Sequence, residues 1–169
     1  MPSVTLRHEI ETDEDTYWAK IVFDEAFNKK MYEGHLKIPS WKLLEMKDDD
    51  AKLTRRVQVE PDAGNLPGPV KKVIGDRLSY VEEGTFDKKT KRYSFKVRPS
   101  ALPDKTKISG EMWVEKLGDK KIARVCQMSV EVKVMLVGGM VEDRILSDLR
   151  RSYDEGTTYT NAYIKENGL

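Results

Sequence analysis

The chain has 169 residues, of which 38% are apolar and 35% carry a charge. This balance predicts one folded domain over residues 1–169, with a strongly solvated surface, rather than a disordered chain. The 30 basic and 29 acidic residues nearly cancel, so the charge gives no reason to expect nucleic acid as a partner.

The single cysteine and the N-terminal residues indicate a compartment. Cys126 alone can form no internal disulfide, which fits a reducing environment. The opening residues, MPSVTLRHEIE, lack the basic and apolar segments of a signal peptide. No apolar run approaches the length that spans a bilayer, so we expect no stable membrane insertion and a cytoplasmic protein.

The first forty residues predict a strand followed by two short helices. Residues 3–10 alternate between polar and apolar side chains, as a half-buried strand does. Thr12, followed by three acidic residues, predicts the start of a helix. Apolar residues then recur at helical spacing from Trp18 to Met31, and Gly34 and Pro39 end the helical region.

Three hairpins follow, because the apolar pattern changes to a period of two. Their predicted strands are 41–47 with 52–60, 77–86 with 92–99, and 106–117 with 121–136. Successive hairpins imply an antiparallel meander, whose apolar face needs a cover. A long helix over residues 140–165 is the element available to cover it.

Two connections are rich in glycine or proline. Residues 61–75, PDAGNLPGPVKKVIG, predict a short helical turn from near Pro69 and form a candidate lid or rim, with a plain connector as the alternative. Gly138-Gly139 lies between the last strand and the last helix. A phosphate-binding loop would follow a parallel strand, so we interpret this pair as a structural corner where helix and sheet come close.

This order of elements resembles the helix-grip fold of the START-like superfamily, which includes polyketide cyclases and relatives of the birch-pollen allergen. The stretches PGPVKKVIGDRLSYVEEGTFD, YSFKVRPSALPDKTKISGEMWVE and VGGMVEDRILSDLRRSYD are similar to an uncharacterised bacterial branch of that superfamily. The resemblance covers essentially the whole chain. It implies an α+β fold in which a curved seven-stranded antiparallel sheet wraps a long C-terminal helix and leaves a ligand cavity between them.

Four polar side chains interrupt rows of apolar residues on the predicted inner faces, namely His8, Arg55, Glu82 and Arg124. Burying an unpaired charge is unfavourable, so each of the four needs a partner, a ligand or water. One hypothesis is purely structural, with the groups at strand ends or paired with one another. The other is that they line a cavity and bind the polar end of a mostly apolar ligand.

The last helix also allows two interpretations, one of which is a cavity. Its apolar stripe begins with Val141 and Ile145 but continues with small, hydroxylated or aromatic residues, as beside a cavity or at a fraying helix end. The candidate ligand-binding residues are therefore His8, Arg55, Tyr80, Glu82, Tyr93, Phe95, Met112, Arg124, Met128, Leu149, Tyr153 and Gly156. Trp41 and Trp113 are candidate exposed contacts for a partner, although a single exposed aromatic residue needs no such role.

Several kinds of chemistry are not indicated by the sequence. His8, His35 and Cys126 show no metal-ligand spacing, and there is neither a GxSxG nor a GxxxxGK[ST] motif, so we expect no metal or cofactor. Cys126 lies mid-strand, where a cysteine usually acts as a small apolar residue.

Three functions remain, and the first is the main hypothesis. It is binding of a hydrophobic or amphipathic molecule such as a lipid, isoprenoid or polyketide. The second is catalysis in the same cavity, with His8 or Glu82 as acid or base and Arg55 or Arg124 stabilising developing negative charge. The third is a protein-interaction module whose interior is filled by its own side chains.

Overall fold

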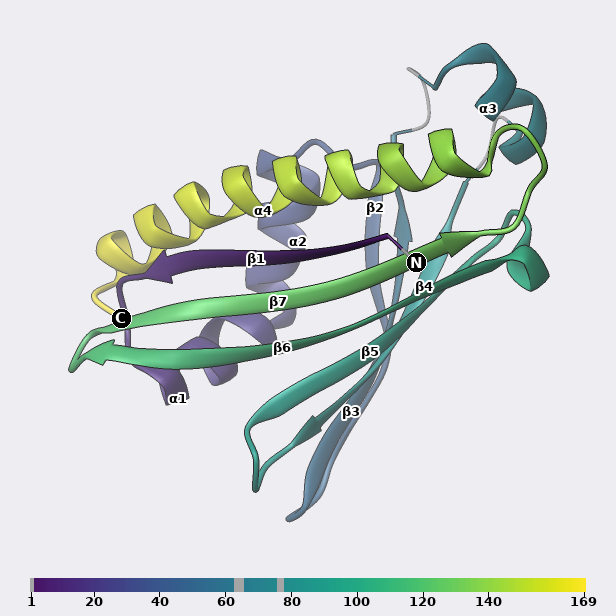
Figure 1. Cartoon of the computed structure of the whole chain (residues 1–169). Coiled ribbons are helices and arrows are strands. Elements are labelled where there is room, and N and C mark those ends of the chain that lie inside the picture. The colour runs from purple at the N-terminus through teal and green to yellow at the C-terminus, as the bar shows by residue number, and fades with distance from the viewer. Residues whose placement is uncertain (1, 63–65, 76–77) are drawn as a thin grey trace.

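The sheet is the frame of the molecule, which we describe from a computed structural model for residues 2–62, 66–75 and 78–169. Seven antiparallel strands pair in the order β1-β7-β6-β5-β4-β3-β2. Figure 1 shows this sheet curving around the long helix α4 (Gly138–Asn167). The strands are β1 (Ser3–Ile10), β2 (Ser40–Asp48), β3 (Lys52–Glu60), β4 (Tyr80–Asp87), β5 (Arg92–Pro99), β6 (Thr106–Gly118) and β7 (Lys121–Val132).

The N-terminal helices close the open side of the sheet. β1 and β2 follow each other in the chain but form the two opposite edges of the sheet. The segment between them must therefore cross from edge to edge, and Figure 1 shows α2 between β1 and β2. This segment consists of α1 (Glu14–Thr16), η1 (Tyr17–Val22), α2 (Glu25–Lys29) and η2 (Lys30–His35), where η1 and η2 are π-helical.

Both helical turns begin at an aspartate rather than at Thr12. The Asp13 carboxylate accepts a hydrogen bond from the Thr16 amide at 2.9 Å, and Asp24 accepts one from the Phe27 amide at 2.7 Å. Thr12, which the sequence pattern placed at the helix start, is fully buried one residue earlier. The prediction was wrong by one residue because a carboxylate at position 13 reaches the first-turn amide.

The three predicted hairpins are confirmed, although some boundaries differ. β4 begins at Tyr80, and residue 77, where we predicted its start, lies outside the described residues. The predicted helical turn near Pro69 is α3 (Gly68–Ile74), with Pro69 in its first turn, where its missing amide hydrogen costs nothing. A short 3-10 helix, η3 (Pro103–Lys105), precedes β6.

β7 ends four residues earlier than the alternating pattern predicted. The Val132 amide donates to the Glu142 carboxylate at 2.8 Å, and the Lys133 amide donates to the Lys105 carbonyl at 2.8 Å. Leu136, the last residue of the predicted strand, takes a left-handed backbone with φ 73° and is 96% exposed. The chain turns at this point because α4 offers its own side-chain acceptor to the end of the strand.

The main core lies between the concave face of the sheet and α4. It includes fully buried Ile10, Phe27 and Val130 together with Val141 and Ile164 of α4. Within the described ranges, no helix has both the length and the apolar character needed to cross a membrane.

The two tryptophans with a possible partner role differ in their surroundings. Trp41, which we considered as an exposed contact, is 3% exposed, so that interpretation was wrong. It packs with Val57 and Val59 in a second small core, since its side chain lies on the inner face of β2. Trp113 lies under the Arg92 guanidinium at 4.4 Å on the outer face of the sheet.

Candidate ligand-binding cavity

A cavity of about 300 Å³ lies between the sheet and α4. Its walls come from the inner faces of β3 to β7, from α4, from the N-terminal helical segment and from α3. The volume is at the lower end of the range for small-molecule pockets, and most of the lining is apolar. The helix grip therefore leaves its interior partly empty.

Eleven of the twelve residues that we selected from the sequence line this cavity; they are Arg55, Tyr80, Glu82, Tyr93, Phe95, Met112, Arg124, Met128, Leu149, Tyr153 and Gly156. Alternation along each strand explains the agreement, because it directs every second side chain inward. On α4, Ser152 and Thr160 also line the cavity, and Thr160 is 2% exposed. The small and hydroxylated stripe of this helix thus borders the cavity and does not fray.

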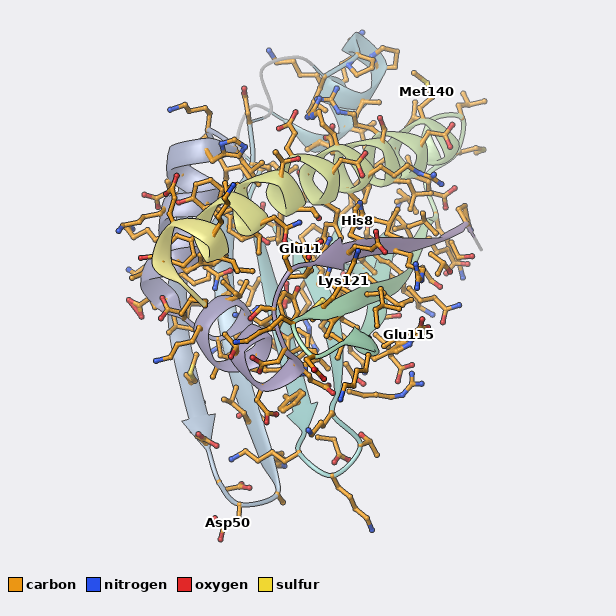
Figure 2. All side chains as sticks on the ribbon, turned by 90° about the vertical axis from the view of Figure 1, so that its left-hand side faces the viewer. His8, Glu11, Asp50, Glu115, Lys121 and Met140 are labelled. Atoms are coloured by element: carbon orange, nitrogen blue, oxygen red, sulfur yellow. The ribbon has the colours of Figure 1, made fainter. Side chains whose placement is uncertain are left out.

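His8 is the exception and lies beside the cavity. Its Nε2 atom is 2.6 Å from Asp154 Oδ1, so it links β1 to α4. Figure 2 shows His8 between the β1 ribbon and α4. Its Nδ1 atom is buried without a hydrogen-bond partner. The inward-facing row on β1 was correctly read, but the strand is an edge strand and its histidine meets the helix rather than the cavity.

Three of the lining residues form one hydrogen-bonded network across β3, β4 and β5. The Tyr93 hydroxyl donates to Glu82 Oε1 at 2.6 Å and accepts from Arg55 Nε at 3.1 Å. Arg55 Nη2 lies 3.7 Å from Glu82 Oε1, and Arg55 Nη1 donates to the Val22 carbonyl at 2.6 Å. Pairing within the protein, one of the two hypotheses for these charges, thus holds for Glu82 and Arg55. The network that they form with Tyr93 is part of the cavity wall.

Two glycines let the aromatic rings of β5 lie flat on the sheet. A Cβ atom on Gly84 would stand 1.9 Å from the Tyr93 hydroxyl, and one on Gly110 would stand 2.7 Å from the Phe95 ring. Both distances are too short for any side chain, so only glycine fits. The position of the Tyr93 hydroxyl next to Glu82 therefore depends on Gly84.

Arg124 on β7 is the second buried guanidinium of the cavity, with 7% of its surface exposed. It donates to the Thr157 hydroxyl at 2.8 Å and stacks 4.6 Å from the centre of the Tyr153 ring. Its Nε atom has no hydrogen-bond partner, and among the described residues no carboxylate lies within ion-pair distance. Unlike Arg55, it has no carboxylate partner within residues 2–62, 66–75 and 78–169.

Burial raises the pKa values of hydroxyl groups in the cavity and of the Cys126 thiol beside it. It raises the pKa of Tyr32 to about 12, and it raises the pKa values of Tyr80 and Tyr93 further, with the Glu82 charge adding to the effect on Tyr93. Burial also raises the pKa of Tyr153 and of the Cys126 thiol, which donates to the Tyr153 hydroxyl at 3.4 Å. At neutral pH these groups are hydrogen-bonding partners and not anions.

The N-terminal helices contribute cavity residues that the sequence analysis missed. Tyr17, Asn28 and Tyr32 all line the cavity. Nothing in the helical spacing distinguishes them from ordinary core positions. Both π-helical segments contribute to the lining, since an extra residue in a turn changes which side chains face inward.

The cavity reaches the surface at the end formed by α3 and the first turns of α4. Lining residues there include exposed Asp62 and half-buried Leu66, Ile74 and Leu102. Figure 1 shows α3 above the N-terminal half of α4. The described parts of residues 61–75 thus form a rim of the cavity, while residues 63–65 of the predicted lid lie outside the described residues.

A curved seven-stranded antiparallel sheet around a long C-terminal helix is the helix-grip fold, and solved structures share it. The chain is similar to the aromatase/cyclase ZhuI from a Streptomyces species, with 11% identity, a TM-score of 0.69, and 99% and 96% of the two chains covered. It is also similar to a START superfamily protein from Mycobacterium smegmatis, with 15% identity, a TM-score of 0.60, and 97% of each chain covered. A third similar structure is norcoclaurine synthase from Thalictrum flavum, with 14% identity, a TM-score of 0.64, and 97% of this chain and 96% of that chain covered.

The chain belongs to a family of proteins of unknown function, DUF2505, whose profile matches residues 5–164. No curated protein matches the sequence. The expected resemblance to START-like proteins and polyketide cyclases is thus confirmed, and at these identities it concerns the fold alone.

Proposed function

We propose that this protein binds a hydrophobic or amphipathic small molecule in the cavity between the sheet and α4. The observation that carries the proposal is the cavity itself: about 300 Å³, mostly apolar, with a few buried polar groups at defined positions. This combination is typical of sites that enclose an apolar ligand and orient it through one polar end. The related fold of a START superfamily protein supports the same function.

The interior argues against a module that only contacts other proteins. Such a module would fill the space under α4 with its own side chains, as ordinary cores do. Here the small or hydroxylated residues Ser152, Gly156 and Thr160 of α4 line a space that remains open. Trp41, one of the two candidate contact residues, is buried. The partner that we propose is therefore a small molecule.

Native mass spectrometry after gentle purification tests the proposal. We expect a co-purifying species with the mass of a small amphipathic molecule, released when the protein is denatured. A screen with fluorescent lipid probes provides a second measurement that does not depend on the expression host. Absence of any adduct together with absence of probe binding would remove the proposed function.

Catalysis in the same cavity is the second candidate function. The hydrogen bond of 2.6 Å between Tyr93 and Glu82, with Arg55 beside both, is an arrangement that can move a proton and stabilise an anion. Two of the similar structures are named as an aromatase/cyclase and a synthase. This observation gives Glu82 the role of acid or base.

A Glu82→Gln variant separates the two candidate functions once a ligand is identified. Catalysis through Glu82 predicts that turnover of the ligand falls by about 10²- to 10⁴-fold while binding persists. Turnover that persists unchanged in the variant would leave Glu82 a structural partner of Arg55. We expect both functions to operate in the cytoplasm, as the single buried thiol of Cys126 suggests.

A further inference from the structure

The charges that line the cavity are equal in number, three positive and three negative, but they are not all paired with one another. The charged lining residues are Arg55, Asp62, Glu82, Arg124, Arg144 and Asp148. Arg55 pairs with Glu82, Arg144 Nε donates to Asp148 Oδ2 at 2.8 Å, and Asp62 has a contact of its own. Within the described part of the chain, Arg124 is the lining charge that is left without an opposite partner.

The burial and the unsatisfied donor of Arg124 favour binding of an anion from outside the protein. A guanidinium has five N–H donors, and this one is 93% buried, with hydroxyl groups as its side-chain acceptors, that of Thr157 at 2.8 Å and that of Tyr17. Its Nε–H is buried and unsatisfied. A buried cation in this condition is unfavourable unless a bound anion restores the pairing that water would have given.

The groups next to Arg124 cannot provide that anion. Tyr153 lies under the guanidinium at 4.6 Å and Cys126 lies two residues along β7. Burial raises the pKa of both, so both stay neutral at physiological pH. On the neighbouring strand, His8 is paired in register with Arg124 and contacts Asp154, and it supplies no negative charge.

Arg124 also lies at the end of the cavity far from its rim. Val132, where β7 turns toward α4, lies eight positions farther along the strand, about 26 Å for an extended chain. Its partner Thr157 lies sixteen residues along α4 from Val141, about 24 Å of helix. Between these ends the lining is largely apolar, with Met128, Ile145 and Leu149.

We propose that the ligand is an amphipathic carboxylic acid whose carboxylate binds Arg124 and whose apolar tail extends toward α3. A carboxylate fits because its two oxygens match the guanidinium fork and would satisfy the free Nε–H. The small volume favours one chain or a compact ring system over a two-chain lipid. This inference rests on the proposed function and assigns both the class and the direction of its ligand.

Calorimetric titration with decanoate and with decan-1-ol tests the inference, because the two probes share a tail and differ in the head group. We expect the wild-type protein to prefer decanoate by about ten- to a hundredfold, the range for a hydrogen bond to a charged group. In Arg124→Gln the preference is lost while decan-1-ol still binds. Arg124→Lys keeps the charge without the fork and retains part of the preference.

An Arg92→Gln variant is the matched control, since Arg92 is exposed on the outer face of the sheet over Trp113. It is expected to bind both probes as the wild type does. Equal affinity of the wild type for both probes, or a preference that survives in Arg124→Gln, overturns the carboxylate assignment and leaves the proposed function intact. If neither probe binds and native mass spectra show no adduct, both fail.

Thermal unfolding supplies a readout that a purely structural arginine would not give. If Arg124 stabilised the fold itself, the Arg124→Gln substitution would lower the unfolding temperature of the ligand-free protein. We expect the ligand-free Arg124→Gln protein to be at least as stable as the wild type, since an unpaired buried charge is gone. Decanoate should raise the unfolding temperature of the wild type but not of the variant.

Discussion

At the scale of single residues, buried polar groups were visible in the sequence but their partners were not. Arg55 and Glu82 stand out because each interrupts an apolar row with a charge. Tyr93, which joins them, is 38 residues from Arg55 and 11 from Glu82, and it meets both only through the register of three strands. Pairing between strands depends on register, which a single strand pattern does not contain.

Glu33 illustrates a stabilising contact that no pattern indicated. This residue of η2 accepts a hydrogen bond from the Trp41 amide at 2.9 Å and one from Lys29 Nζ at 3.1 Å. The Trp41 bond, followed by the Lys29 bond, lowers the pKa of Glu33 below its ordinary value of 4.5. The carboxylate thereby ties the N-terminal helices to the edge strand β2.

The lowered pKa of Glu33 gives a pH-dependent prediction. Stabilisation by this carboxylate is complete above pH 4.5 and is lost as the pH falls through the folded-state pKa. Glu33→Gln should therefore unfold a few degrees below the wild type at pH 7, with the difference vanishing in acid. Thermal melts across the pH range measure it, with exposed Glu60→Gln as control; a difference that stays constant down to acid pH would contradict it.

At the scale of elements, the corner between β7 and α4 was predicted in part. Gly138 does allow a close approach, because a Cβ there would lie 2.4 Å from the Val132 carbonyl oxygen. The left-handed backbone of the turn falls on Leu136 and not on either glycine. Both glycines belong to the first turn of α4, so the helix starts earlier than its apolar pattern shows.

The two glycines of this corner should respond to alanine in opposite directions. Gly138→Ala forces the Val132 carbonyl away from the helix and should cost about 1 to 3 kcal/mol. Gly139→Ala meets no atom within 4 Å and should gain up to about 1 kcal/mol, as alanine favours a helix. Chemical denaturation measures both, and equal effects of the two substitutions would refute a role of close packing at Gly138.

At the scale of the whole molecule, the order of elements predicted the fold because each element had its own periodicity. The alternating strands, the hairpin turns and the long amphipathic helix predict the helix-grip fold without any information on contacts. The sequence did not reveal how the N-terminal helices cross from β1 to β2. Tyr17, Asn28 and Tyr32 enter the cavity only through that crossing, so these lining residues were not predictable.

The cavity is created by the packing of the sheet around α4 and not by one residue. A single bulky side chain that points into it should nevertheless fill it. Leu149 on α4 lines the cavity midway between Arg124 and the rim, whereas Leu117 on β6 is 43% exposed. Leu149→Trp places an indole where a ligand tail would lie, while Leu117→Trp makes the same exchange at the surface. Both variants should remain folded, because the first has empty volume to occupy and the second has solvent.

Native mass spectrometry and titration with decan-1-ol then distinguish the two variants. We expect Leu149→Trp to lose both the co-purifying species and the binding of the neutral probe, with its circular dichroism spectrum unchanged. Leu117→Trp should keep both. Because the neutral probe has no charged head, its loss in Leu149→Trp reports the occupied space and is independent of Arg124. Binding that survives in Leu149→Trp would mean that the ligand lies somewhere other than between the sheet and α4.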